Sequence, residues 1–220
     1  MSTPFSLAFV RPSTFGTLAA VHLPSGVEAV TNEVLDRLDP DERAIARGLR
    51  GRRQIEFTGG RLAWRAINAE AGPLRTGERG EPLCPPGLSV SLTHKTDLAL
   101  ALVGAAGRGT LGLDLEGDGR ARMTIADRVL RPEEREVVWQ LPEADRWRAV
   151  LIRFALKEAA YKAIHPHLLR FVGFQEAQVT LGAEGQAGVV IISEPTLALE
   201  AGWEALDADK VLASVRATHL

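Results

Sequence analysis

Two short segments in the second half of the sequence combine acidic and basic side chains in patterns that suit phosphate chemistry. The first is Gly112-Leu-Asp-Leu-Glu116, in which Asp114 and Glu116 alternate with leucines. Successive strand residues point to opposite faces, so a strand here places both carboxylates on one face. Neighbouring carboxylates repel one another unless a cation lies between them, and such oxygen ligands suit Mg²⁺. A sheet with one solvated face shows the same pattern, and the pentapeptide alone does not separate the two interpretations.

The second segment is Phe154-Ala-Leu-Lys-Glu-Ala-Ala-Tyr-Lys-Ala163, which contains no glycine or proline and is predicted to be helical. At about 100° per residue, Lys157, Glu158 and Lys162 fall within an arc of roughly 140°. Two aromatic side chains share this arc, whereas the opposite side is mostly alanine. Aromatic side chains interspersed with charged ones are typical of a helix that lines a cleft. The alternative is a surface helix stabilised by the Glu158–Lys162 pair.

Two groups in the first half of the sequence are candidates for binding an anion. Thr93 and His94 end a predicted strand, where a hydroxyl and an imidazolium can contact a phosphate. The stretch 43–65 holds seven arginines and one acid, and Arg53 and Arg61 can grip a phosphate with two hydrogen bonds each. The alternatives are a structural histidine and a solvated helix face. Few aromatic residues interleave with the arginines, so a platform for single-stranded nucleic acid is less favoured.

Composition narrows the classes of protein to which the chain can belong. The 220 residues carry a net charge of −2, so no global field selects nucleic acid or an anionic membrane. Cys84 is the only cysteine, which excludes an internal disulfide and indicates a reducing compartment. The N-terminus has no signal-peptide pattern, and no stretch reaches 18 apolar residues. We therefore expect a cytoplasmic protein, monomeric, that binds neither nucleic acid nor membrane.

The periodicity of apolar residues predicts an α+β chain with two similar lobes, 1–108 and 109–220, each with a small sheet packed on helices. The N-terminus is expected to be irregular before the apolar segment 15–23, and 72–87, with four glycines and four prolines, is expected to be a loop. The predicted helices are 27–38, one from near 40 to past 50, 57–69, 120–130, 132–141 and 142–164. The predicted strands are 89–94, 98–103, 111–116, 177–181, 189–192, 197–199 and 211–217.

Taken together and in this order, the motifs resemble those of the 4′-phosphopantetheinyl transferases of the surfactin and enterobactin synthesis type. That family is similar in its Gly-[Ile/Leu]-Asp-[Ile/Leu]-Glu strand, matched at 112–116, and in its Lys-Glu helix about 40 residues later, matched at 154–163. Upstream, a Ser-x-[Ser/Thr]-His strand is matched at 91–94 and a Gly-Arg-x-Ala-x-Arg helix at 60–65. A Gly-x-Pro loop is matched at 80–82. The likeness spans roughly residues 50 to 175.

The resemblance implies a pseudo-twofold pair of α+β lobes with coenzyme A between them. It implies that Asp114, Glu116 and Glu158 hold Mg²⁺ against the pyrophosphate of coenzyme A. By the same resemblance, Lys157 and Lys162 neutralise this pyrophosphate, with Lys157 stabilising charge as it develops. Glu158 is the candidate base for the proton of a serine on an apo carrier protein.

For the other end of coenzyme A, the resemblance implies that His94, Arg53 and Arg61 hold the 3′-phosphate and adenosine. Thr93 stands where many relatives have serine, and Arg79 is a further candidate. The surface that faces the carrier protein is expected to be apolar and to lie in 117–150. Two other classes remain open: a different Mg²⁺-dependent phosphotransferase, and a nonenzymatic module that binds RNA or an acidic partner.

Overall fold

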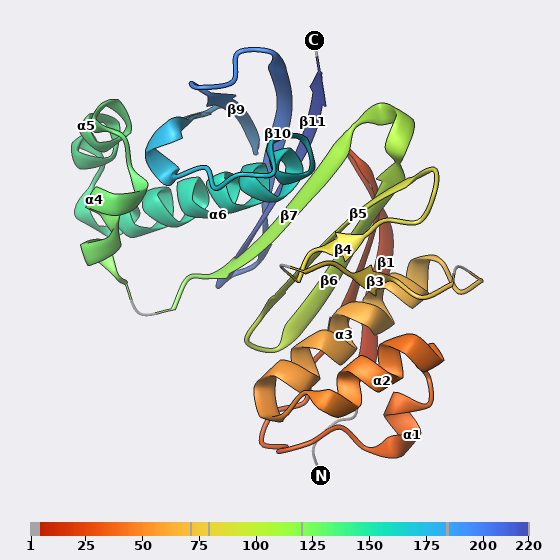
Figure 1. The fold of residues 1–220 in the computed structure, drawn as a ribbon. Helices are drawn as coiled ribbons and strands as arrows, with labels where there is room; N and C mark the ends of the chain where they lie inside the picture. The colour runs from red at the N-terminus through yellow and green to blue at the C-terminus, as the bar shows by residue number, and fades with distance from the viewer. Residues whose placement is uncertain (1–4, 71, 79, 120, 184, 220) are drawn as a thin grey trace. The chain divides into compact units, whose positions relative to one another are not determined.

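The computed structural model describes the chain except for residues 1–4, 71, 79, 120, 184 and 220. The chain divides into two compact units, Met1–Arg108 and Gly109–Leu220, hereafter the N-terminal unit and the C-terminal unit (Figure 1). Each unit has an antiparallel sheet of its own with one long helix packed on it. The predicted α+β class is therefore confirmed. The pseudo-twofold relation between the lobes stays a prediction.

The sheet of the N-terminal unit has four antiparallel strands in the order β1-β2-β6-β5. They are β1 (Ser6–Ser13), β2 (Gly16–His22), β6 (Leu98–Ala105) and β5 (Leu88–Lys95). The central pair, β2 and β6, is rich in small and branched apolar residues, because helix α3 lies against it. The N-terminal segment, expected to be irregular, forms β1 because its backbone pairs with β2 along the edge of the sheet.

Three helices follow β2: α1 (Asn32–Leu35), α2 (Pro40–Gly48) and α3 (Gly51–Ile67). The prediction of a helix over 27–38 was wrong for most of that range, since only the four residues of α1 are helical. Asp39 caps α2, accepting the backbone N–H of Asp41 at 3.1 Å, with Pro40 in the first turn. The chain then breaks at Leu49, so α3 begins six residues before the predicted 57–69.

The glycine- and proline-rich segment 72–87 lacks helices among its described residues but contains two short strands. These are β3 (Arg75–Thr76) and β4 (Pro82–Leu83), which pair in an antiparallel manner. The segment was predicted to be a loop, and apart from these two short strands its described residues form one.

The sheet of the C-terminal unit has five antiparallel strands in the order β7-β11-β10-β9-β8. They are β7 (Thr110–Gly117), β11 (Lys210–His219), β10 (Leu197–Asp207), β9 (Gln186–Ile191) and β8 (Ala177–Leu181). The predicted strands 111–116, 177–181 and 211–217 all lie within these elements. Strand β10 extends well beyond the predicted 197–199 because it pairs with β11 as a long hairpin from Leu197↔His219 to Asp207↔Lys210.

The described residues of the C-terminal unit form three α-helices: α4 (Ala126–Val129), α5 (Pro132–Gln140) and α6 (Glu143–Leu168). The 3₁₀ turns η2 (Met123–Ile125) and η3 (Phe174–Glu176) lie in the same unit, and η1 (Ala106–Arg108) ends the N-terminal unit. The predicted helix over 120–130 forms only in part, as the 3₁₀ turn η2 followed directly by α4 over residues 123–129. Helix α6 runs over 26 residues and packs against β7 and β11. No helix among the described residues is both long and apolar enough to span a membrane.

Candidate active site

The contact between β7 and α6 is unusually close at Gly112. A Cβ built on this glycine would lie 1.8 Å from the carbonyl oxygen of Ala159, a distance no real side-chain atom tolerates. Glycine therefore lets the strand and the helix backbones approach one another. Asp114 shares the strand face of Gly112, two residues further along, so its carboxylate points at the same helix.

Asp114 meets Lys162 of α6 on this face. The Lys162 ammonium donates to Oδ1 of Asp114 at 2.7 Å and to the carbonyl oxygen of Leu113 at 2.8 Å. Asp114 is only 7% exposed, and its second oxygen, Oδ2, is buried with no hydrogen-bond partner in the structure. A buried carboxylate oxygen without a donor is costly, and it is the type of atom that a hard cation binds. The residues present therefore fit a Mg²⁺ ion beside Asp114.

Glu116 and Glu158, the other two predicted carboxylates, are both half-buried, one on β7 and one on α6. Across the described part of the chain, however, no three His, Cys, Asp or Glu side chains are grouped so as to hold a metal ion. A metal site that they share with Asp114 therefore stays a prediction. The Lys162 ammonium faces Asp114 in this structure, and its positive charge offsets that of the carboxylate.

Lys157 shares the predicted arc of α6 with Glu158 and Lys162, yet it is only 2% exposed. Its ammonium donates to Glu134 and to two backbone carbonyl groups. The arc is wide, and Lys157 lies at one edge of it. From that edge the long lysine side chain reaches the interior of the unit. A direct contact between Lys157 and a phosphate would require these bonds to be exchanged.

A pocket of about 90 Å³ opens in the C-terminal unit beside Glu158. Apart from Lys157 and Glu158, its lining consists of aromatic, aliphatic and glycine residues: Tyr161, Ile164, Phe171, Val172, Gly173, Phe174, Ala177 and Ile191. The rings of Tyr161 and Phe171 lie 5.9 Å apart. A small apolar pocket with an acid at its border can hold an uncharged chain next to a polar reacting group.

In the N-terminal unit, His94 lies at the end of β5 with its side chain 45% exposed. Its Nδ1 atom is 3.3 Å from Oε1 of Glu56, and the same oxygen accepts a hydrogen bond from Arg52 at 2.7 Å. Arg53 is exposed on α3, whereas Thr93 is buried in β5. The structure thus leaves the imidazole and the Arg53 guanidinium accessible, and their predicted contact with the 3′-phosphate stays a prediction.

Arg61, the other predicted phosphate ligand of α3, is 4% exposed. Its guanidinium donates to Oγ1 of Thr76 at 2.7 Å and stacks on the ring of Phe57 with 4.3 Å between the guanidinium carbon and the ring centroid. Burial lowers the pKa of Arg61 to about 10, and nearby Glu42 opposes this shift. Phosphate binding would require the Thr76 bond to be exchanged. Arg79 lies outside the described residues.

Ion pairs hold many of the arginines in 43–65 within the N-terminal unit. Arg43 pairs with Asp36 and Arg52 with Glu56, while Arg65 reaches Glu42. Guanidinium groups neutralised in this way contribute less to the counterion release that drives binding to RNA. The arrangement therefore does not favour the RNA-binding alternative.

Sequence reasoning missed a buried glutamate of the C-terminal unit, Glu134, which accepts a hydrogen bond from the Lys157 ammonium at 2.7 Å. The available signal was the start of α5, where Pro132 stands in the first turn and Glu134 at the third position, as in a capping box. This pattern predicts a helix start, and the segment was interpreted only in that sense. The contact between Glu134 and Lys157 of α6 is a tertiary contact, and no local sequence pattern predicts it.

The two-unit α+β fold, with a buried carboxylate between a strand and a helix, agrees with two family matches. Residues 110–214 match the model of the 4′-phosphopantetheinyl transferase superfamily. Residues 41–104 match the model of the 4′-phosphopantetheinyl transferase N-terminal domain. The matches divide between the C-terminal and the N-terminal unit, and both point to one class of transferase.

Individual relatives agree with this class. The chain is 34% identical over 171 residues to the 4′-phosphopantetheinyl transferase Npt of Nocardia iowensis, covering 74% of this chain and 76% of the relative. It is 32% identical over 180 residues to the 4′-phosphopantetheinyl transferase PptT of Mycobacterium tuberculosis, covering 76% and 78%. The chain belongs to the 4′-phosphopantetheinyl transferase superfamily and is an enzyme.

Among solved structures, a holo-(acyl-carrier-protein) synthase from Bacillus anthracis in complex with coenzyme A (3′,5′-ADP) has a TM-score of 0.42 and 20% identity to this chain. The match covers 50% of this chain and 96% of that synthase. It thus extends over half of the present sequence.

Proposed function

We propose that the protein transfers the 4′-phosphopantetheine group of coenzyme A to a serine of an apo acyl or peptidyl carrier protein, with Mg²⁺, as a cytoplasmic monomer. Family membership supports the reaction class. The observation that carries the site is the Asp114 carboxylate, buried between β7 and α6, with one oxygen on Lys162 and the other unpaired. A site for a cation and a phosphate side by side is what this reaction needs.

In the proposed reaction the serine Oγ attacks the β-phosphorus of coenzyme A. The bond from this phosphorus to the oxygen of the leaving group breaks, and 3′,5′-ADP departs with the electron pair. The serine proton passes to the Glu158 carboxylate, directly or through a water molecule. Asp114, Glu116 and Glu158 would hold Mg²⁺, which neutralises charge on the pyrophosphate.

Lys162 is the cation of this site that we assign to the pyrophosphate. Its side chain is 32% exposed, so part of the ammonium can reach a ligand while it stays close to Asp114. The pocket beside Glu158 also supports the proposal, because its apolar lining suits the uncharged pantetheine chain. In the N-terminal unit, His94, Arg53 and Arg61 are proposed for the 3′-phosphate, and Thr93 for the same end of the ligand.

The deciding experiment weighs an apo carrier protein by mass spectrometry after incubation with the enzyme, coenzyme A and Mg²⁺. The proposal expects a mass gain equal to one phosphopantetheine group and the appearance of 3′,5′-ADP. Chelation by EDTA is expected to abolish the gain and added Mg²⁺ to restore it. A carrier that remains unmodified across a panel of acyl and peptidyl carriers would refute the proposal, and full activity in EDTA would refute its metal requirement.

A further inference from the structure

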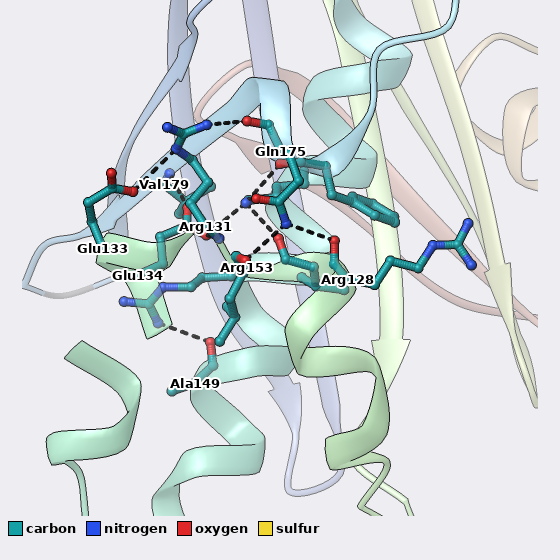
Figure 2. Close-up of polar contacts among 12 residues, drawn as sticks. Arg128, Arg131, Glu133, Glu134, Ala149, Arg153, Gln175 and Val179 are labelled. Atoms are coloured by element: carbon teal, nitrogen blue, oxygen red, sulfur yellow. Dashed lines mark hydrogen bonds and ion pairs between the residues drawn. The ribbon is translucent and has the colours of Figure 1, made fainter. Parts of the chain in front are cut away.

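Glu134 is a buried acid whose two oxygens join several elements of the C-terminal unit. It is 4% exposed. Its Oε2 accepts the backbone N–H of Arg131 at 2.8 Å, which closes the first turn of α5, and its Oε1 accepts the N–H of Val179 in β8 at 2.6 Å. Figure 2 shows Glu134 between these groups and the side chains of α6. Both oxygens therefore have donors before any charged partner is counted.

The charged partner of Glu134 is Lys157. The ammonium donates to Oε2 of Glu134 at 2.7 Å, to the carbonyl oxygen of Val129 at 2.8 Å and to that of Phe174 at 3.0 Å. A lysine ammonium has three N–H donors, so all three are used inside the unit. The two side chains are 1% and 3% exposed.

This pair fastens α6 to three other elements at one point. Val129 ends α4, Glu134 lies in α5, and Phe174 begins η3, while the Val179 bond extends the connection to β8. Burial disfavours the charged lysine and lowers its pKa, and Glu134 opposes this shift. The ammonium is thus retained in the interior because Glu134 compensates its charge.

A second cation lies close to this pair. Arg153, one helical turn before Lys157, is 4% exposed and donates to the carbonyl oxygen of Ala149 at 3.0 Å (Figure 2). Burial lowers the pKa of Arg153, and Glu134 raises it. Glu134 therefore offsets two buried cations, and its loss would affect α6 over a full turn.

We propose that Glu134 and Lys157 are positioning residues for the transfer reaction: their buried pair fixes the turn of α6 that carries Glu158, and Lys157 does not itself contact the pyrophosphate. This rests on the proposed function and assigns direct charge neutralisation by lysine to Lys162 alone. Glu158 follows Lys157 in the chain and lines the pocket with it. Any rotation of this turn therefore moves the Glu158 carboxylate relative to Asp114 on β7.

The test uses the variants E134Q, K157M and E134Q/K157M, each compared with the intact enzyme for kcat, for KM of coenzyme A and for the Mg²⁺ concentration that gives half-maximal rate. Supporting groups behind metal and catalytic residues typically contribute about 10- to 100-fold. We expect E134Q and K157M each to lower kcat by about this factor and to raise the Mg²⁺ requirement, with little change in KM for coenzyme A.

The double variant shows whether Glu134 and Lys157 act together as a pair or contribute independently. It removes the buried ammonium together with its carboxylate and leaves only Arg153 without Glu134, whereas E134Q leaves both cations, so its loss is expected to be no larger than that of the worse single variant. It also serves as the test protein if E134Q alone fails to fold. A direct phosphate contact predicts the opposite pattern: near-normal kcat for E134Q, and a raised KM for K157M and the double variant. That pattern would overturn the proposal.

E200Q is the matched control, since Glu200 forms an exposed pair with Arg216 in the same unit at 2.6 Å. It is expected to keep wild-type kcat and Mg²⁺ dependence. Failure of the proposed function is recognised separately, because the intact enzyme then modifies no carrier. In that case, calorimetric titration of each variant with coenzyme A and Mg²⁺ tests the positioning role. Weaker Mg²⁺-dependent binding by both E134Q and K157M supports it, and wild-type binding by E134Q refutes it.

Discussion

The two units contain the same buried acid in the same setting. In the N-terminal unit, Glu42 is 1% exposed and stands at the third position of α2, after Pro40, just as Glu134 stands in α5. Oε1 of Glu42 accepts the backbone N–H of Leu74 at 2.9 Å, and Oε2 accepts Arg65 at 3.0 Å. The basic partner follows the acid by 23 residues in both units. One device thus anchors the long helix of each unit.

Strands β2 and β7, which pack against these helices, also correspond. Strand β2 begins Gly16-Thr-Leu, and β7 begins at the threonine of Gly109-Thr-Leu. A Cβ on Gly16 would lie 2.1 Å from the carbonyl oxygen of Val103, and one on Gly109 would lie 2.4 Å from that of Ala217. Each glycine therefore lets its strand approach the last strand of its own unit at the same position.

The two units differ at the positions of the three predicted carboxylates. Counting from these glycines, the N-terminal unit has Val21 where the C-terminal unit has Asp114. By the same count Leu23 stands opposite Glu116. On the long helices, Ala66 follows Arg65, whereas Glu158 follows Lys157. The comparison teaches that the two units share these packing features, and that the three acids proposed for the metal site stand only in the C-terminal unit.

The largest expected effect tests the acid that only the C-terminal unit has. E158Q keeps the size of the side chain but removes the proposed proton acceptor, which is also a proposed metal ligand. It should lower kcat by about 100- to 10,000-fold, the usual contribution of a general base. The matched variant A66E changes the corresponding exposed position of α3 and should retain activity. Carrier modification by E158Q at the normal rate, measured by mass spectrometry, would remove Glu158 from the mechanism.

The buried acids provide the next comparison, through E134Q and E42Q. Removing one partner of a buried ion pair costs about 3–5 kcal/mol, so E134Q should lower the free energy of unfolding by about that amount. E42Q should cost less, because the Arg65 side chain is 20% exposed and that of Lys157 only 1%. Urea unfolding of both variants measures the difference. Equal losses would show that exposure of the basic partner does not set the cost.

The two units also differ in how closely a glycine lets the long helix and the sheet pack together. Gly112 faces a backbone oxygen of α6, whereas a Cβ on Gly59 of α3 would chiefly meet the end of the Leu23 side chain at 2.2 Å. A side chain can turn away and a backbone cannot. We expect G112A to lower stability by about 3 kcal/mol, the upper part of the overpacking range, and G59A by about 1 kcal/mol. Thermal melts of the two variants decide whether the order holds.

The N-terminal unit should contribute to binding rather than to turnover. H94A is expected to weaken the affinity for coenzyme A by about tenfold, or ~1.4 kcal/mol, with kcat at saturating coenzyme A nearly unchanged. Isothermal titration calorimetry measures the first quantity and initial rates the second. An unchanged affinity would exclude His94 from the 3′-phosphate site.

The smallest effect concerns a histidine pair at the end of the C-terminal unit. Desolvation, and then the neighbouring His219, lower the pKa of His167. The unfolded chain therefore takes up the proton first, and stability should fall as the pH drops below about 6.5, until the folded protein is protonated as well. Melting temperatures between pH 7.5 and 5 should show this decline in the intact protein. H167Q should reduce the decline, and an identical pH profile would exclude His167 as its source.

Local patterns identified most elements and the candidate acids. Alternation over 112–116 predicted β7, and the absence of glycine and proline over 154–163 predicted the centre of α6. Both follow from periodicity within one segment. The short helices were predicted less well. Residues 27–31 have helical patterning yet no helix forms, because a short helix depends on tertiary packing more than on propensity.

The sequence by itself determined the fold class, the family and which residue types can meet a phosphate and a cation. Only the tertiary structure decided the partners of these residues. It placed Lys157 on Glu134 and Lys162 on Asp114, although both lysines lie on one helix and carry the same charge. The reason is that burial and pairing depend on segments far apart in the chain, and helical spacing carries no information about which neighbour each face will meet.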